Sequence, residues 1–247
     1  MSAKTYMVGN WKMNQTSAEV ESFFAELKLD NNQNNFWIAP QTLHIGKCLE
    51  LGAKAGVLIG AQNCSENEFG AFTGENSVDT LSEMGVHFTL VGHSERRTLF
   101  GETDKIINKK VLKAASAGVL PILCVGETLE EREAGKTLDI VLGQIKAGLA
   151  GVNIQNESEI IVAYEPVWAI GTGKTASPEQ AGEVHDAIRG LLVELYGEFG
   201  QDISILYGGS VKPNNVEDLL AQTNINGGLV GGASLKAESF NALCAAC

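Results

Sequence analysis

The sequence is poor in basic residues and has no long apolar run. Its 247 residues include 18 Lys and Arg against 30 Asp and Glu, which gives a formal net charge of −12. This negative excess argues against nucleic acids and anionic membrane surfaces as partners. No apolar stretch reaches the ~18 residues that a membrane helix requires. We therefore expect no nucleic-acid or membrane partner, and any phosphate-bearing ligand must be bound by local groups against the overall field.

Cysteine is scarce and irregularly spaced. An odd number of scattered cysteines is typical of reduced thiols in the cytosol, and this chain has five: Cys48, Cys64, Cys124, Cys244 and Cys247. A strand-like run begins by Thr5 without a preceding apolar signal segment, so we expect a cytoplasmic location. The final Cys-Ala-Ala-Cys has the letters of a redox or prenylation motif but neither context. We interpret it as a helix end with two incidental cysteines.

Nucleotide and cofactor motifs are also missing. Residues 171–175 resemble the end of a phosphate-binding P-loop, but that motif needs a glycine where Trp168 stands. The following helix starts on a capping box at residues 177–180, whereas a P-loop enters its helix at the Lys-Thr itself. No dinucleotide fingerprint or metal-ligand cluster occurs. We expect no cofactor and no metal.

Short apolar runs alternate with amphipathic stretches eight times along the chain. The predicted strands are residues 5–8, 36–39, 57–61, 88–91, 119–125, 160–163, 203–206 and 228–230. They are apolar on both faces, as in a buried parallel sheet. The first helix is expected to start on a capping box from Thr16 to Glu19. The sixth buries one face with a 3.6-residue period: Ala181, Val184, Ile188, Leu191, Leu192 and Leu195.

Eight strand–helix units in a chain of this length predict one α/β domain, residues 1–247, folded as a closed (β/α)8 barrel. A doubly wound open sheet is the alternative. There is no linker and no break in composition that would divide the chain. In a (β/α)8 barrel the reactive groups lie at the carboxyl ends of the strands.

Polar side chains follow several of these strands. Asn10 and Lys12 follow the first strand, His93 and Glu95 the fourth, and Glu165 the sixth. Glu165 stands before a proline and beside a glycine-rich segment, which favours a catalytic base under a moving loop. A structural interpretation stays open for each, such as a solvated lysine or a histidine that only holds the fold. If the barrel closes, these groups converge on one mouth.

Glycine pairs follow the last two strands. Gly208 and Gly209 precede Ser210, and Gly231 and Gly232 follow the eighth strand. Exposed backbone N–H groups at glycine-rich helix starts bind anions without a positive side chain. We expect both pairs to lead into helices and to form a phosphate site, although a simple turn is compatible with each.

Five segments together resemble the triosephosphate isomerase family. They are VGNWKMN from residue 8, VGHSERR from 91, AYEPVWAIGTGKTA from 163, YGGSV from 207 and VGGASL from 230. The resemblance covers the whole chain in family order. It implies a TIM barrel without cofactor that interconverts dihydroxyacetone phosphate and D-glyceraldehyde 3-phosphate through an enediol(ate), in glycolysis and gluconeogenesis.

The resemblance also assigns roles to residues. Glu165 becomes the base, and His93 a neutral imidazole whose position before a helix start disfavours its charged form, as described for this family. Lys12 supplies positive charge, Asn10 orients it and the substrate, and Glu95 supports Lys12. The phosphate is expected on the N–H groups of four residues: Gly171, Ser210, Gly231 and Gly232.

Further expectations concern the surroundings of the site. By resemblance, residues 166–176 form a lid that Tyr207 and Ser210 latch when it closes. Arg96 is expected to pair with a carboxylate, Glu102 being one candidate, and Cys124 to pack near the base. The remaining histidines are expected to be structural: His44, His87 and His185.

The last expectation is a homodimer. Residues 62–75 are long for a strand–helix connection and carry Phe69 and Phe72 among small residues. In the family this loop enters the second subunit, where Thr73 is expected to contact the partner's active site near its first and fourth strand ends. Two alternatives stay open: a barrel that binds sugar phosphates without turnover, and an isomerase for a bulkier phosphosugar.

Overall fold

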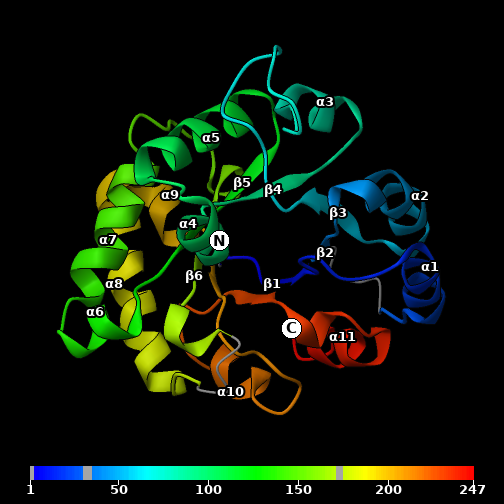
Figure 1. Cartoon of the computed structure of the whole chain (residues 1–247). Helices are drawn as coiled ribbons and strands as arrows, with labels where there is room; N and C mark the ends of the chain where they lie inside the picture. The colour runs from blue at the N-terminus through cyan, green and yellow to red at the C-terminus, as the bar shows by residue number, and fades with distance from the viewer. Residues whose placement is uncertain (1–2, 30–34, 171–174) are drawn as a thin grey trace.

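The structure is a computed structural model that describes residues 3–29, 35–170 and 175–247. Its eight strands form one closed barrel in chain order, and every neighbouring pair is parallel, including β1 with β8. Figure 1 shows the helices arranged around the strands. The predicted closed (β/α)8 barrel is confirmed, and the open sheet is excluded because β1 and β8 are hydrogen-bonded.

The strands lie within two residues of their predicted bounds. They are β1 (Tyr6–Asn10), β2 (Phe36–Ala39), β3 (Leu58–Ala61), β4 (Phe88–Val91), β5 (Leu120–Val125), β6 (Ile161–Tyr164), β7 (Ile205–Tyr207) and β8 (Gly227–Val230).

The described helices cover the outside of the barrel and its connections. The α-helices are α1 (Ser17–Glu26), α2 (Ile45–Ala55), α3 (Val78–Glu83), α4 (Ser94–Phe100), α5 (Asp104–Ser116), α6 (Leu129–Glu133), α7 (Thr137–Gly148), α8 (Pro178–Tyr196), α9 (Glu198–Asp202), α10 (Val216–Leu220) and α11 (Ala237–Cys244). Four short 3₁₀ turns are η1 (Thr42–His44), η2 (Glu157–Glu159), η3 (Val167–Ala169) and η4 (Gly232–Ser234).

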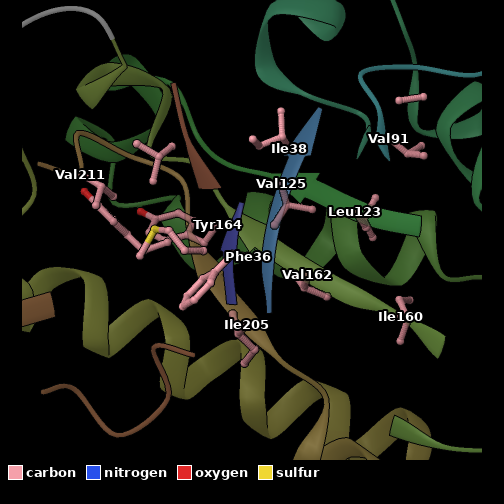
Figure 2. Packing of buried hydrophobic residues seen from close by; sticks show 14 of the residues in the cluster. Phe36, Ile38, Val91, Leu123, Val125, Ile160, Val162, Tyr164, Ile205 and Val211 are labelled. Atoms are coloured by element: carbon pink, nitrogen blue, oxygen red, sulfur yellow. The ribbon is translucent and has the colours of Figure 1, made fainter. Parts of the chain in front are cut away.

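Apolar side chains form two packed layers. Alternate strand residues such as Val8, Leu90 and Leu206 fill the barrel interior. Their neighbours pack outward against the helices, and Figure 2 shows part of this outer layer, with Leu123 on β5 and Val162 on β6. Both faces of the strands are therefore largely buried, which explains why the strands read as continuous apolar runs rather than as alternating ones.

Side-chain caps fix where the long helices begin. Thr16 and Glu19 form the predicted capping box of α1. Ser177 and Gln180 form that of α8, whose first residue is Pro178. The predicted buried face of α8 is correct except at its end, where Leu195 is 41% exposed. Leu195 belongs to the last turn of α8, one residue before its end.

The carboxyl end of the chain agrees with the interpretation of its cysteines as part of a helix end. Cys244 is the last residue of α11 and is buried, whereas Cys247 is exposed. In the part of the chain that the structure describes, no helix has the length and apolar character needed to cross a membrane.

Candidate active site

A cavity of about 260 Å³ lies at the carboxyl ends of the strands. Its walls bring together most of the residues that the sequence singled out: Asn10, Lys12, His93, Glu165, Ser210, Gly231 and Gly232. Glu95 reaches this group through Lys12. Gly171 lies outside the described residues, as does the middle of the expected lid. The convergence follows from barrel closure, because residues far apart in sequence end their strands at one rim.

A larger hollow of about 600 Å³ lies elsewhere, against the amino-terminal ends of β5 and β6. It is lined by apolar side chains such as Leu112 and Val152, with His87 at its edge. None of the predicted site residues contributes to it. Size alone would favour this hollow, but Lys12, His93 and Glu165 meet in the smaller cavity.

Lys12 is held in an unusual backbone conformation at the end of β1. Its φ of 52° lies in the left-handed region, which costs a residue with a side chain on the order of 1 kcal/mol. The Asn10 Oδ1 accepts the Lys12 N–H at 3.1 Å, and the Gln62 side chain donates to the Lys12 carbonyl at 2.8 Å. The Lys12 Nζ lies 2.6 Å from Glu95 Oε1. The ammonium is thus aimed and paired before any substrate arrives.

His93 and Glu165 face each other inside the cavity. His93 Nε2 lies 3.0 Å from Glu165 Oε1, and the two side chains are 6% and 2% exposed. The other carboxylate oxygen accepts the Ser94 N–H at 3.1 Å. His93 is the N-cap of α4, and its Nδ1 accepts the Glu95 N–H at 3.2 Å. Nδ1 therefore carries no proton, which places the proton of the neutral ring on Nε2.

Two opposing effects act on the pKa of His93. Burial lowers it, but the Glu165 charge and hydrogen bond raise it, and the net direction is upward. The position before a helix start was expected to disfavour the charged ring. His93 does lie before the helix start. In this arrangement, however, the adjacent Glu165 carboxylate raises the pKa of the ring and outweighs the expected effect of that position. A ligand that separates His93 from Glu165 removes that contribution and leaves burial to favour the neutral ring.

The glycine pair after β7 allows the chain to approach the carboxylate. A Cβ built on Gly208 would lie 2.6 Å from Glu165 Cγ, and one on Gly209 would collide with the Tyr207 hydroxyl. The expectation that this pair leads directly into a helix is wrong, because the next helix, α10, begins at Val216. In the intervening turn the N–H groups of Gly208 and Val211 donate to the carbonyls of Tyr164 and Gly209.

The glycine pair after β8 does enter a helical turn. Gly232 is the first residue of η4, and a Cβ on it would meet nothing within 4 Å. A Cβ on Gly231 would lie 3.5 Å from Lys12 Cε. An anion bound at this turn would therefore lie close to the stem of Lys12.

Sequence reasoning missed Glu127, which holds the segment after the carboxylate. This fully buried residue accepts hydrogen bonds from Trp168 Nε1 at 2.9 Å and from the Tyr164 hydroxyl at 3.1 Å. Arg132 donates to it at 3.2 Å and lies 4.8 Å from the Trp168 ring centroid. Its place just past the fifth strand was the available signal, because His93 and Glu165 also lie just past strands.

The remaining predictions concern supporting residues. Arg96 does pair with Glu102, with Nε 2.6 Å from Oε1, and Lys110 shares the same oxygen. Cys124 is fully buried near the carboxylate, as predicted. Burial, together with the charge of Glu165, raises the pKa of its thiol well above the usual value.

Two of the other histidines make side-chain contacts with backbone carbonyls, and the ring of His87 lies 4.9 Å from that of Trp37. His185 Nδ1 lies 2.9 Å from the Asn224 carbonyl, and His44 Nε2 lies 3.0 Å from that of Gln15. The residues described here contain no group of three or more His, Cys, Asp or Glu side chains that could hold a metal ion.

The closed parallel barrel, with its group of ionisable side chains at the carboxyl rim, defines a (β/α)8 barrel protein of the enzyme type. The sequence profile described as triosephosphate isomerase matches residues 5–247. The chain therefore belongs to the triosephosphate isomerase family.

Individual relatives agree with this assignment. The triosephosphate isomerase of Syntrophotalea carbinolica is 47% identical over 241 residues, which cover 96% of both chains. That of Prosthecochloris aestuarii is 49% identical over 245 residues, covering 97% of this chain and 96% of the relative. A crystal structure of triosephosphate isomerase from Bartonella henselae matches with a TM-score of 0.90 at 37% identity and covers 98% of each chain.

Proposed function

We propose that this chain interconverts dihydroxyacetone phosphate and D-glyceraldehyde 3-phosphate, with Glu165 as the base. The observation that carries the proposal is a carboxylate only 2% exposed, placed 3.0 Å from the His93 imidazole in a cavity that the glycines after β7 and β8 line. The reaction moves a carbonyl by one carbon without net oxidation. It therefore requires one group that removes a proton from carbon and returns it to the adjacent carbon.

Glu165 is suited to both transfers. Its carboxylate is largely removed from water, so a proton that it takes from the substrate is kept for return rather than lost to solvent. The Cβ-free Gly208 gives the side chain room at its Cγ. The end of β6 fixes its backbone, since its N–H donates to the Val125 carbonyl at 2.7 Å.

His93 and Lys12 are assigned to interact with the oxygen atoms of the substrate. The Nε2–H of His93 can donate to the substrate carbonyl and then relay protons between the two oxygens of the enediol(ate). The Glu95 N–H at Nδ1 keeps this tautomer in place. Lys12, steered by Asn10 and Glu95, supplies positive charge for the phosphate and for the oxygen that becomes negative.

The phosphate is assigned to backbone N–H groups of Ser210, Gly231 and Gly232, with Gly171 as the family resemblance implies. An enediolate that carries phosphate eliminates it readily in water, so we assign residues 166–176 to a protective lid. Two contacts support a fixed start to this lid, namely the hydrogen bond from Trp168 to Glu127 and the bond from the Val167 N–H to the Glu127 carbonyl.

A coupled assay on both triose phosphates, without added metal or nucleotide, tests the function. We expect turnover in both directions that is lost in Glu165→Gln. Binding of the triose phosphates without turnover would favour the binding-protein alternative. Turnover of a larger phosphosugar in preference to the trioses would favour an isomerase for a bulkier substrate. A cavity of about 260 Å³ suits a triose phosphate better than such a substrate.

We also propose a homodimer in which residues 62–75 enter the partner's site and Thr73 contacts it. The connection from β3 to α3 projects beyond the helices in Figure 1. Phe69 and Phe72 on it are 71% and 45% exposed, and Met13 beside Lys12 is 87% exposed. Exposed apolar side chains at the active-site rim are suited to an isologous interface. We further assign residues 1–247 to one domain in the cytoplasm, consistent with free cysteines.

A further inference from the structure

Lys212 is an exposed cation on the wall of the active-site cavity that the assigned chemistry does not use. It follows Ser210 after β7. The structure gives it no ion pair with any of the described carboxylates, whereas the other lysine of the cavity, Lys12, is paired with Glu95 at 2.6 Å. Lys212 therefore places a positive charge on the cavity wall that no described carboxylate balances.

The backbone around Lys212 is fixed. Its N–H donates to Asn215 Oδ1 at 2.8 Å, and Asn215 Nδ2 donates to the Ser210 carbonyl at 3.0 Å. The Val216 N–H closes the turn on the Lys212 carbonyl at 3.1 Å. The turn therefore keeps the base of the Lys212 side chain close to Ser210, one of the proposed phosphate donors.

The charges around the cavity give Lys212 its importance. The Lys12 ammonium is balanced by Glu95, and Glu165 is negative when the His93 ring is neutral, as the proposed chemistry requires. Without Lys212 the titratable groups of the site would carry a net charge of about −1, inside a protein of net charge −12. A phosphate dianion that approaches from solvent would then be repelled.

The backbone donors cannot replace a cation at a distance. An N–H group is a dipole, and its attraction for an anion falls more steeply with separation than that of a full charge. The N–H groups of Ser210, Gly231 and Gly232 are therefore suited to hold a phosphate once it has arrived. A full positive charge still acts across the ~10 Å Debye length of a solution of 0.1 M ionic strength.

We propose that Lys212 is a substrate-capture residue that attracts the phosphate dianion to the cavity mouth before the backbone donors bind it. This rests on the proposed function only for the identity of the substrate, because the capture of an oxyanion is a property of the charge. The step involves no bond change. Its signature is a contribution to encounter that salt removes, rather than a contribution to the chemical step.

The test compares Lys212→Gln with Lys146→Gln, which removes an equal charge from α7. We expect Lys212→Gln to lower kcat/KM for glyceraldehyde 3-phosphate by about three- to fivefold at ~10 mM ionic strength, with kcat nearly unchanged. The difference should disappear near ~0.5 M salt, where charges are screened within a few ångströms. The control should match the parent, and phosphate-free glyceraldehyde should not distinguish the two variants.

Calorimetric titration with inorganic phosphate supplies a readout that does not depend on turnover. The Kd should rise about threefold in Lys212→Gln and stay unchanged in Lys146→Gln at low salt. Equal kcat/KM and equal phosphate Kd in the parent and Lys212→Gln at low salt would overturn the proposal. A parent that binds phosphate through Lys212 but does not isomerise triose phosphates would instead refute the proposed function and leave capture supported.

Discussion

Glu165 Oε1 lies 3.0 Å from His93 Nε2, so the proposed base and the proposed acid contact each other directly. The second carboxylate oxygen is also occupied, by the Ser94 N–H at 3.1 Å. A substrate carbonyl that accepts the Nε2–H must take the place of Glu165. The carboxylate is then free to turn toward carbon. Substrate binding and activation of the base are therefore one event in this geometry.

Shortening the side chain of the base should show whether the position of the carboxylate matters independently of its charge. In Glu165→Asp the carboxylate keeps its charge but is withdrawn by one methylene. We expect kcat to fall by ~10²-fold, because a displacement of about 1 Å has effects of that order on proton transfer. The thermal midpoint should change little. Turnover near that of the parent would show that another group is the base.

Removing the charge of Glu165 should reverse the pKa shift of His93. The Glu165 carboxylate raises the pKa of the ring, whereas burial lowers it. In Glu165→Gln the raising contribution is lost, so the pKa of His93 should fall below that of the parent. Titration of the imidazole followed by ¹⁵N NMR measures this. An unchanged or higher pKa in the variant would contradict the electrostatic description of the pair.

A methyl group on Gly208 should disturb the base without unfolding the barrel. Its Cβ would lie 2.6 Å from Glu165 Cγ, so the carboxylate has to move. We expect Gly208→Ala to lower kcat by at least about tenfold. Gly143→Ala is the matched control, because a Cβ there meets nothing within 4 Å and the residue lies inside α7. Equal activity of the two variants would rule out the close approach as a requirement for catalysis.

The stability of the fold should depend on pH through His185. Burial lowers the pKa of this histidine from 6.5 to about 4. Between these two pH values, His185 binds a proton in the unfolded chain but stays neutral in the folded chain. The contribution of the neutral His185 to the free energy of unfolding is thus complete above pH 6.5. About 3 kcal/mol of that free energy is lost as the pH falls toward 4.

Urea unfolding at several pH values checks this against His185→Gln, which does not titrate. The variant should show a flatter fall in the free energy of unfolding between pH 6.5 and 4. Parallel curves for the two proteins would mean that other groups account for the acid lability.

The proposed dimer should depend on the loop between β3 and α3. Deletion of residues 69–74 removes Phe69, Phe72 and Thr73, and should give soluble monomers with little activity. Analytical ultracentrifugation alongside the coupled assay measures both properties. A fully active monomer, in either the parent or the deletion variant, would refute the role given to the partner subunit.

Much of this arrangement could be predicted from the sequence, because a closed barrel brings together the residues that follow its different strands. Once eight apolar runs indicate a closed parallel sheet, residues just past the strands must share one rim. Asn10, His93 and Glu165 were found in this way, although no local pattern joins them.

Contacts that depend on side-chain direction could not be predicted. The hydrogen bond from Trp168 to Glu127 joins residues far apart in sequence, and neither has a periodic pattern that points to the other. Leu195 keeps the apolar period of α8 but lies in its last turn, and the period alone does not show where the buried face ends. Lys212 has an ordinary sequence context, and only its place in the lining of the cavity distinguishes it from other exposed lysines.

Closure of the barrel also sets the order of events during synthesis. The strand β1 needs β8 as its second neighbour, yet the two lie near opposite ends of the chain. As a nascent chain leaves the ribosome, one edge of β1 therefore stays unpaired until almost all of the protein has been made. Exposed strand edges are sites of wrong association. We expect aggregation of truncated or stalled chains to begin at Tyr6–Asn10, so the interval before the last strand emerges is the one in which a chaperone would be most needed.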